Sequence, residues 1–537
     1  MAKKNGNGEK VKSMEAWIWD AACSIRGAAD AAKYKDYILP LIFVKRLCDV
    51  FDDEIDRIAD ELHKRNTRAE RSRSKALQLV ERDKSLVRFY LPIRPKDPEK
   101  ETTWDVIRTL SDKIGQQLTD ILRSVAKENP SLQGIIDRID FNATTHGQRD
   151  IDDDRLSKLI EKITEKRLGL RDVEPDIIGR SYEYLIRKFA EGSGQSAGEF
   201  YTPAEVGFIM AKIMDPEPGM EVYDPTCGSG GLLIKCELVL EEKMTLRQAQ
   251  GDKKGKYAPL KLYGQEFTPA TWAMSKMNMV IHDMEGEIEI GDTLKNPKFR
   301  TKNNKLKTFD RIVANPMWNQ GRDSLPYIND DFFINDEWER FPAGSCGGKI
   351  DWGWMQHIYS SLNDTGKAAV ILDTGAASRG SGNQGNNKEK DCRKWFVDND
   401  LIEGVIYLPE NLFYNTTAPG IIIFLNKNKK HKNKIYLLHA GKEFEKGDPK
   451  NYIPESSIER IVNAYKAFKE EEKFARLVSK EEIVKNDYNI SPSRYIQITD
   501  AETYRPIGEL VEELNALEEE AVAIDKELKN IFKKLGI

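Results

Sequence analysis

The side chains best suited to chemistry lie in residues 310–318, which read Asp-Arg-Ile-Val-Ala-Asn-Pro-Met-Trp. The apolar run at 312–314 predicts a buried strand that ends at Asn315. The side-chain oxygen of Asn315 and the main-chain carbonyl of Pro316 could both accept hydrogen bonds from one NH2 group, which would aim the nitrogen lone pair at an electrophile. Trp318 could stack on the ring that bears this amine, a contact of about 1–3 kcal/mol. Alone, an Asn-Pro pair is more often a simple turn, so the upstream sequence decides.

A glycine-rich turn lies upstream, where Glu221-Val-Tyr-Asp-Pro-Thr-Cys-Gly-Ser-Gly-Gly231 precedes three apolar residues. The pattern predicts a short strand, a turn and then the start of a helix. Gly228, Gly230 and Gly231 allow positive φ and close approach of a ligand. The helix N-terminus adds unpaired N–H groups and a partial positive charge. Doubly wound sheets bind nucleotide-like ligands at such turns, which follow the carboxyl end of a parallel strand.

The residues around these glycines narrow the class of ligand. A phosphate-binding P-loop would carry Gly-Lys-Ser/Thr, but Leu232 follows Gly231. A dinucleotide fingerprint counted from Gly228 would need a third glycine where Leu233 stands. We therefore expect a ligand without a pyrophosphate that has an amino-acid end and a ribose. Asp224, inside the motif, suits an ammonium group or a bound water.

Two further acids end predicted strands. Residues 261–266 predict a strand whose last residue, Glu266, could accept both hydroxyls of a ribose. A third strand reaches Ile290 and is followed by Gly291-Asp292, which places Asp292 to bond an adenine amine. Each acid by itself is as often an ordinary solvated strand end. Their common order, ending in Asn-Pro-x-aromatic, favours one shared site.

At this point the chain resembles the amino-methyltransferases that use S-adenosylmethionine, in which the glycine motif precedes an Asn-Pro-Pro-aromatic motif. Residues 198–206, Gly-Glu-Phe-Tyr-Thr-Pro-Ala-Glu-Val, resemble the cofactor-binding segment of the modification subunits of type I restriction-modification systems. Residues 34–49 resemble the helical domain of that family, and residues 408–420 resemble its segment before a later strand. The resemblance covers most of the chain.

The resemblance implies a site-specific DNA methyltransferase that acts on the N6 amine of adenine. Its implied catalytic residues are Asn315, Pro316 and Trp318. The residues implied to bind S-adenosyl-L-methionine are Glu199, Phe200, Tyr201, Thr202, Pro203, Ala204, Asp224, Gly228, Ser229, Gly230, Gly231, Glu266 and Asp292. No metal site is expected.

The expected fold class is α/β, with a Rossmann-like S-adenosylmethionine-dependent methyltransferase domain, a helical N-terminal domain and a C-terminal coiled-coil helix. We place the helical domain at 11–170, a connecting helix at 171–197, the catalytic domain at 198–475 and the C-terminal helix at 500–537. Apolar strand-like runs alternate with helical ones from about 198 to 440, as in a parallel α/β sheet. Residues 376–387, rich in Gly, Ser and Asn, are expected to form a mobile loop near the substrate.

The C-terminal helix carries an apolar seam with acidic flanks, which predicts a partner helix or packing on its own domain. The seam comprises Ile507, Leu510, Leu514, Leu517, Ala521, Ile524, Leu528, Ile531 and Leu535. The resemblance implies that this helix binds a specificity (S) subunit, that a second copy of the chain joins the same complex and that DNA is the substrate. Whether a restriction (R) subunit also joins stays open.

Composition fits this interpretation without proving it. At 537 residues with a net charge of −5, the chain should form two or three domains and lacks the strong basic excess of a stand-alone DNA binder. The six scattered cysteines indicate reduced thiols in a cytoplasmic protein. No run approaches 18 apolar residues, so no membrane contact is expected. Basic clusters at 64–75 and 427–434 are more often solvated faces than phosphate tracks.

Other interpretations stay open. The usual second proline of the motif is Met317, so the backbone there lacks a locked φ, which could mark a catalytically weakened assembly subunit. Protein-glutamine methyltransferases share the Asn-Pro-Pro-aromatic motif, because the amide nitrogen of glutamine must be positioned in the same way. A nicotinamide oxidoreductase is disfavoured by the missing third glycine, and cytosine also carries an exocyclic amine.

Overall fold

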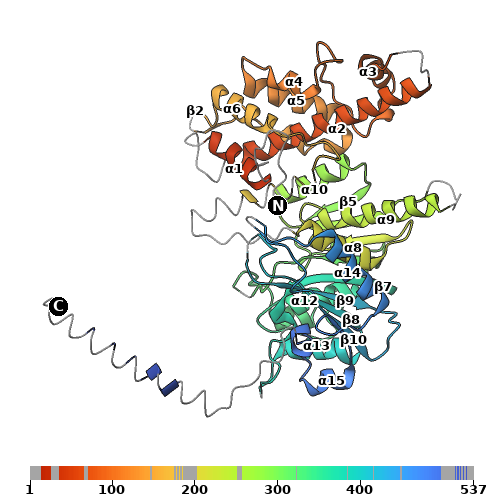
Figure 1. Cartoon of the computed structure of the whole chain (residues 1–537), viewed down its shortest axis with the longest axis vertical. Coiled ribbons are helices and arrows are strands. Elements are labelled where there is room, and N and C mark those ends of the chain that lie inside the picture. The colour runs from red at the N-terminus through yellow and green to blue at the C-terminus, as the bar shows by residue number, and fades with distance from the viewer. Residues whose placement is uncertain are drawn as a thin grey trace.

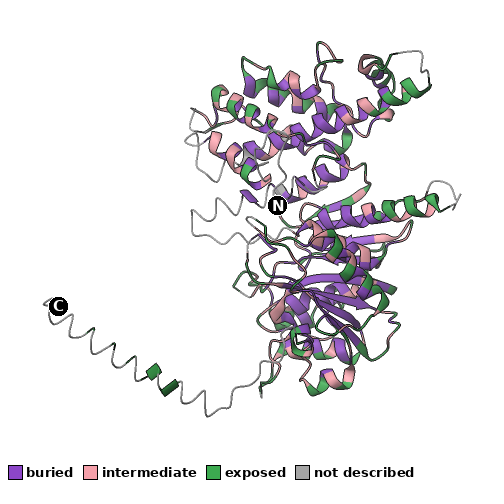
Figure 2. Cartoon of the chain, in the orientation of Figure 1, coloured by how far each residue is buried: buried purple, intermediate pink, exposed green. Residues whose placement is uncertain are grey.

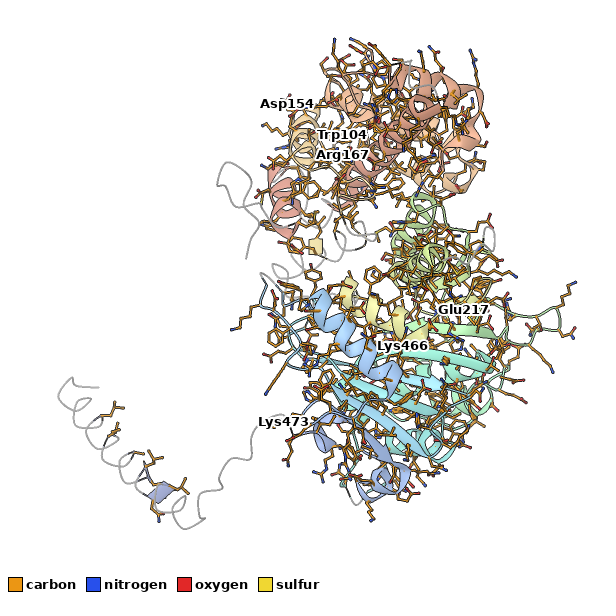
Figure 3. All side chains as sticks on the ribbon, turned by 45° about the vertical axis from the view of Figure 1, so that its right-hand side comes forward. Trp104, Asp154, Arg167, Glu217, Lys466 and Lys473 are labelled. Atoms are coloured by element: carbon orange, nitrogen blue, oxygen red, sulfur yellow. The ribbon has the colours of Figure 1, made fainter. Side chains whose placement is uncertain are left out.

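The computed structural model shows a helical N-terminal unit next to a unit built on a large sheet (Figure 1). It describes residues 14–25, 35–65, 70–145, 148–173, 177, 179, 181, 184–185, 202–250, 257–321, 323–383, 385–414, 416–447, 450–497, 514–515, 517–518, 521, 524 and 528. Figure 3 labels Trp104 and Arg167 in the helical unit, and Glu217 and Lys466 in the sheet unit.

The helical unit is organised around α2 (Lys35–Arg65), a long amphipathic helix whose buried face meets the other helices. Trp17 and Trp104 are almost fully buried in its core. The other elements are α1 (Met14–Ser24), α3 (Arg73–Arg82), α4 (Thr103–Arg108), α5 (Ile114–Glu128), α6 (Asp153–Thr164), the 3-10 turns η2 (Lys84–Leu86), η3 (Pro130–Leu132) and η4 (Ile136–Arg138), and the strands β1 (Thr144–Thr145) and β2 (Gln148–Arg149). The predicted helical character of this region is confirmed.

The sheet unit holds nine strands in the order β11-β10-β8-β9-β7-β6-β3-β4-β5. Their inward residues form the purple core of Figure 2. The strands are β3 (Glu221–Asp224), β4 (Lys261–Glu266), β5 (Gly286–Ile290), β6 (Phe309–Ala314), β7 (Leu362–Asp373), β8 (Ile402–Tyr407), β9 (Gly420–Asn426), β10 (Lys434–His439) and β11 (Ala475–Ser479).

Helices cover this sheet in the alternating pattern that the sequence predicts. They are α8 (Ala204–Met214), α9 (Gly231–Ala249), α10 (Pro269–Ile281), α11 (Asp330–Ile334), α12 (Asp351–Ser360), η5 (Thr374–Ala377), α13 (Lys388–Asp398), α14 (Glu455–Ala467), α15 (Lys480–Lys485) and α16 (Pro492–Tyr495). β6, β3, β4 and β5 are parallel neighbours, with β3 in contact with both β6 and β4. Successive strands thus run to opposite sides of β3, which creates a ligand-binding switch point.

The expectation of a parallel sheet from about 198 to 440 is wrong at one strand, β9, and the later strand β11 also runs antiparallel to its neighbour. β9 lies antiparallel between β7 and β8, and β11 is antiparallel to β10. The connection 408–419 returns β9 directly beside β8, which it follows, so no crossover helix intervenes.

The mobile loop expected at 376–387 is wrong for its first two residues, which are buried in a short helical turn. Ala376 and Ala377 belong to η5 and are fully buried. The carbonyl oxygen of Ala376 accepts the indole N–H of buried Trp352 at 3.0 Å. Two alanines are small enough to pack beneath α12, a property that a count of polar residues in the segment conceals.

Helix α10 joins the two units. Its residues Met274, Met277 and Ile281 belong to the apolar core of the helical unit. Arg88 of that unit donates to the carbonyl of Ile281 at 3.0 Å. A second link places the Tyr414 hydroxyl 2.5 Å from the Glu15 carboxylate in a buried hydrogen bond. The helical unit therefore packs on α10 and on the connection between β8 and β9.

Two predicted helices fall largely outside the described residues. Within 171–197, the described residues 177, 179, 181, 184 and 185 are helical. In the C-terminal helix, five seam residues are described, and all are helical and exposed: Leu514, Leu517, Ala521, Ile524 and Leu528. Among the described residues, no helix has the length and apolarity to cross a membrane.

Candidate active site

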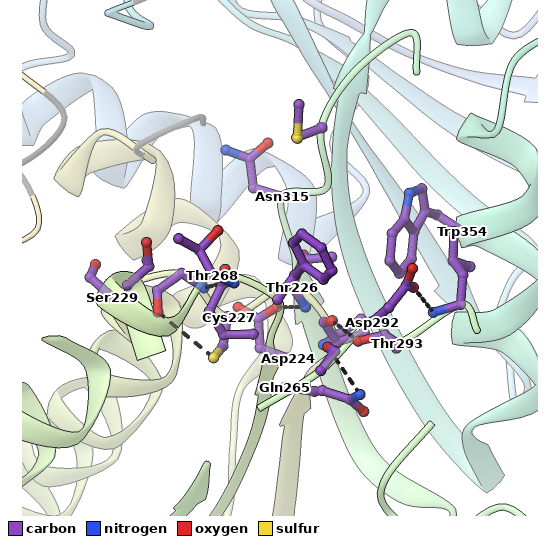
Figure 4. Close-up of a pocket in the computed structure, with 18 of the residues that line it drawn as sticks. Asp224, Thr226, Cys227, Ser229, Gln265, Thr268, Asp292, Thr293, Asn315 and Trp354 are labelled. Carbon is purple, nitrogen blue, oxygen red and sulfur yellow. Dashed lines mark hydrogen bonds between the residues drawn. The ribbon is translucent and has the colours of Figure 1, made fainter. Parts of the chain in front are cut away.

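A cavity of about 400 Å³ opens where four parallel strands end (Figure 4). Asp224 ends β3, Glu266 ends β4, Asp292 follows β5 and Asn315 follows β6. All four residues line the cavity. The structure therefore brings together the strand-end groups that the sequence places in one site.

Asn315 is held by two hydrogen bonds. Its amide nitrogen donates to the Thr202 hydroxyl at 3.0 Å, and its side-chain oxygen accepts the Trp318 indole N–H at 3.1 Å. An indole nitrogen can only donate, so this contact identifies which end of the carboxamide is oxygen. That oxygen keeps a second lone pair, because Trp318 uses only one.

Trp318 is only 9% exposed and lies outside the cavity lining, as does the buried Pro316. Its ring meets Phe413 in an edge-to-face contact, with 4.8 Å between centroids and 72° between planes. Gly420 leaves room for this pair, since a Cβ there would lie 3.0 Å from atoms of both rings. Phe413, which sequence reasoning did not single out, comes from the connection between β8 and β9.

The glycine turn has the backbone that its sequence predicts. Gly228 and Gly230 adopt φ of 53° and 82°, which only glycine takes without strain. A Cβ on Gly230 would also lie 3.0 Å from the Met279 side chain. Helix α9 starts at Gly231, and the Asn278 amide of α10 donates to the Ser229 carbonyl at 3.0 Å. The turn is thereby fixed from the helix that joins the two units.

The Glu266 carboxylate fastens the turn to the neighbouring strand end. It accepts the Gly228 N–H at 3.0 Å and the Thr268 N–H at 2.7 Å. Glu266 also lines the cavity, so the carboxylate that holds the turn also stands where a ligand would contact it.

Asp292 is similarly engaged. One oxygen accepts the N–H groups of Leu294 and Lys295 at 3.0 and 3.1 Å, and the other accepts the Tyr327 hydroxyl at 2.5 Å. An adenine amine at Asp292 would therefore share the oxygen that Tyr327 contacts. Tyr327 also lines the cavity. The sequence gives no signal for it, because Tyr327 lies 35 residues from Asp292.

Asp224 is 1% exposed, and its environment favours the neutral acid. Burial raises the pKa of the Asp224 carboxyl to about 8, and the nearby Glu266 carboxylate adds to that rise. Hydrogen bonds from Thr226 lower the pKa but do not offset burial. A positively charged ligand group in the cavity would relieve this penalty.

Three more lining residues fit a planar, polar ligand. Phe267 is 70% exposed directly after Glu266, so its ring presents an open face. The indole N–H of Trp354 and the hydroxyl of Thr271 are buried without a hydrogen-bond partner among the described residues. Buried donors are rarely left unpaired, so a ligand atom is the natural partner. The position of Phe267 after a strand-end acid is a usable sequence signal, whereas Trp354, on α12, gives none.

Buried polar side chains support the cavity from behind. The Gln265 amide bonds the carbonyls of Gly291 and Asn296 at 3.2 and 3.0 Å. Arg340, which has no exposed surface, donates to the carbonyls of Thr293 and Leu294 at 3.2 and 2.6 Å. These bonds connect the loop after β5 to β4 and to the segment between α11 and α12.

Among the other predicted cofactor residues, the cavity is lined by Thr202, Gly228, Ser229 and Gly231 and not by Pro203, Ala204 or Gly230. Glu199, Phe200 and Tyr201 lie outside the described residues.

Comparison with known sequences identifies the family. The N-6 DNA Methylase family matches residues 173–503, and the HsdM N-terminal domain matches residues 14–163. The chain belongs to the N-6 DNA methylase family. The match supports neither a nicotinamide oxidoreductase nor a protein-glutamine methyltransferase.

Relatives of this family member are type I methylase subunits. The MjaVIII subunit of Methanocaldococcus jannaschii is 36% identical over 69% of this chain and 62% of its own length. The MjaIX subunit of the same organism is 28% identical over 98% of this chain and 92% of its own length. A type I methyltransferase subunit from Streptococcus thermophilus has a similar structure, with a TM-score of 0.64, 26% identity and coverage of 90% and 99% of the two chains. The predicted family and the α/β methyltransferase fold with a helical N-terminal region are thus confirmed.

Replacing Phe267 by Ala should weaken S-adenosylmethionine binding by about 5- to 100-fold, because stacking of a base on an aromatic ring contributes about 1–3 kcal/mol. Calorimetric titration would measure the dissociation constant. Ile334→Ala is the control, since Ile334 is 74% exposed and does not line the cavity. Equal affinities of the wild type and Phe267→Ala would remove Phe267 from the ligand site.

Binding of S-adenosylmethionine should release a proton from Asp224. With a pKa of about 8 the carboxyl is protonated at pH 6.5, and a ligand cation beside it favours the carboxylate, so up to about one proton leaves per site. Affinity should therefore rise as the pH increases from about 6 toward 8. Titrations in two buffers of different ionisation enthalpy count the protons, with Asp224→Asn as the control. Proton-neutral binding to the wild type would show that no cation approaches Asp224.

Proposed function

We propose that this chain is the methyltransferase subunit of a type I restriction-modification system, which methylates the exocyclic N6 amine of adenine in DNA. The observation that carries the proposal is the placement of the Asn315 carboxamide on the wall of the cavity that the glycine turn also lines. An amine acceptor and a nucleoside-type pocket are thereby adjacent. The membership of the N-6 DNA methylase family supports the same reaction.

The cavity residues fit S-adenosylmethionine as the cofactor. Asp224 would face its ammonium end, Glu266 its ribose hydroxyls, and Asp292, Phe267 and Trp354 its adenine. When bound, the cofactor supplies a methyl group on a positively charged sulfur. Such a ligand would supply partners for Trp354 and Thr271, whose buried N–H and hydroxyl have none among the described residues, and a positive charge for Asp224.

The chain's own groups would position the amine. The target base must leave the duplex to reach a buried site. The free lone pair of the Asn315 oxygen and the Pro316 carbonyl would then accept its two N–H groups. No general base is needed, because the methylated ammonium loses its proton readily to water. Catalysis would come mainly from orientation of the lone pair.

Trp318 would present the ring on which the base stacks, with the fully buried Phe413 packed against it. Their edge-to-face contact leaves one ring held at a fixed angle to the other. The indole also orients Asn315 through its N–H, so the same ring that contacts the base would fix the acceptor.

Sequence recognition would come from a partner. The two basic clusters include residues paired with acids of this chain: Arg71 with Asp60, and Lys429 with Asp400. These pairs offset part of the charge of each cluster, which supports a specificity subunit as the reader of the DNA sequence. A second copy of this chain, bound to the same specificity subunit, would supply the methyltransferase for the other half of the site. A restriction subunit would be a further partner of this assembly.

The C-terminal helix would dock this specificity subunit. All five described seam positions are exposed, with Leu514 at 58% and Leu517 at 57%. Their spacing of three and four residues places them on one helix face. An apolar face of this kind is suited to a partner helix.

Asn315→Ala should lower methyl transfer by at least about 100-fold, because it removes the acceptor that aligns the amine. Methyl incorporation into DNA by the complex with the specificity subunit measures this, and calorimetry should show nearly unchanged cofactor affinity. Asn335→Ala is the control, because the Asn335 side chain is exposed and donates to Asp331. Full activity of Asn315→Ala would exclude the proposed role.

The double change Leu514→Glu with Leu517→Glu should abolish co-purification with the specificity subunit, because it charges the apolar seam. Cofactor affinity should not change, since the seam is exposed. The matched control is Asn515→Glu, which adds a carboxylate at an exposed position of the same helix outside the seam. Normal assembly of the Leu514/Leu517 variant would place the docking surface elsewhere.

A further inference from the structure

The residue that follows the Asn-Pro-Met-Trp segment is gripped on three sides. The Asn319 N–H donates to the Asp351 carboxylate at 3.0 Å, and its carbonyl accepts the Lys349 ammonium at 2.7 Å. Its side-chain oxygen accepts the Arg379 guanidinium at 2.8 Å. Asn319 takes φ of 57°, a conformation that Asn tolerates better than most residues. Main chain and side chain are thus both fixed one residue after Trp318.

Arg379 is the centre of this arrangement. Its guanidinium bonds Glu389 at 2.5 Å and Asp373 at 2.7 Å, and it also pairs with Asp351, whose side chain has no exposed surface. Bonds between a guanidinium and carboxylates are stronger than neutral ones. The backbone of Arg379 is anchored as well, since its carbonyl accepts the buried Arg393 guanidinium at 2.9 Å.

The charge of this cluster argues against a direct contact between Arg379 and DNA. Three carboxylates surround one guanidinium, which leaves the group net negative and repels a phosphate. The Arg379 guanidinium already donates four hydrogen bonds, one of them to the Asn319 side-chain oxygen. The arrangement therefore acts within the protein.

Met317 explains why such an arrangement is useful. The family motif has proline there, and proline locks φ near −65°. Met317 leaves that torsion free. It stands between Asn315 and Trp318 in the sequence, and its own side chain lines the cavity. Its sulfur accepts the Gln320 amide at 3.4 Å, and the Gln320 carbonyl accepts the Ile350 N–H at 3.0 Å. The chain beyond Met317 is thus held from the start of α12.

We propose that Asp351, Arg379 and Asn319 form a clamp that fixes the catalytic segment in place of the missing proline. The clamp holds the chain just after Trp318, so that Asn315 and Trp318 keep their mutual hydrogen bond. Arg379 and Asp351 are positioning residues in this arrangement. The inference rests on the proposed amine methylation at Asn315.

Arg379→Gln tests the clamp in the complex with the specificity subunit. The turnover number for methyl transfer should fall by about 10- to 100-fold, as expected for displacement of an aligned group by about 1 Å. The dissociation constant of S-adenosylmethionine should stay within about twofold, and amide hydrogen exchange at 318–320 should accelerate because the Asn319 N–H loses its fixed acceptor. The matched control is Arg460→Gln, which removes a guanidinium that pairs with Glu443 and Glu471 at the surface.

The decisive variant adds Met317→Pro to Arg379→Gln. If the clamp replaces the proline, the double variant should turn over at least about tenfold faster than Arg379→Gln alone. A merely structural arginine would not be rescued by a proline at 317. Where Arg379→Gln does not fold, Asn319→Gly removes the same side-chain contact at a backbone position that suits glycine, and should lower turnover by about tenfold.

The outcomes separate this inference from the proposed function. An inactive wild-type complex would contradict the methyltransferase proposal itself. An active wild type with unchanged turnover in Arg379→Gln, or a double variant that folds but shows no recovery, would overturn the clamp. Loss of cofactor affinity parallel to the loss of turnover would also overturn it, because the damage would then extend to the whole cavity.

Discussion

The orientation of one carboxamide governs the rest of this site. Asn315 can present its oxygen to an incoming amine only if its nitrogen is directed away, and Thr202 and Trp318 enforce this from opposite sides. Because an indole can only donate, the orientation has no equally good flipped alternative. β6 brings this group to the edge of the cavity, and the contact of Trp318 with Phe413 fixes the ring that bonds it.

The acids at the strand ends have two duties. Glu266 and Asp292 each accept main-chain N–H groups that shape the cavity wall, and each also lines the cavity itself. A change at either residue would therefore disturb the walls as well as a ligand contact. Asp224 is different, since its burial keeps it largely neutral near pH 7. The cavity thus combines a rigid frame with one group whose charge depends on its contents.

Much of this was predictable, and the exceptions have physical reasons. β3, β4, β5 and β6 were predicted because apolar runs that end in polar residues are local signals, and their parallel order brings those ends together. Tyr327, Arg340 and Trp354 were not, because their approach to the cavity depends on long loops and on α12. The antiparallel entry of β9 was missed because strand direction leaves no trace in composition. The buried start of 376–387 was missed because alanine is uninformative about burial.

One residue connects the cavity with the helical unit. Met274 of α10 lines the cavity and also belongs to the apolar core of the N-terminal helices. A ligand that contacts the Met274 side chain would therefore be coupled to the packing of the helical unit, and through it to a macromolecule bound there. By thermodynamic linkage, the ligand and the macromolecule would then change each other's binding affinity by the same factor.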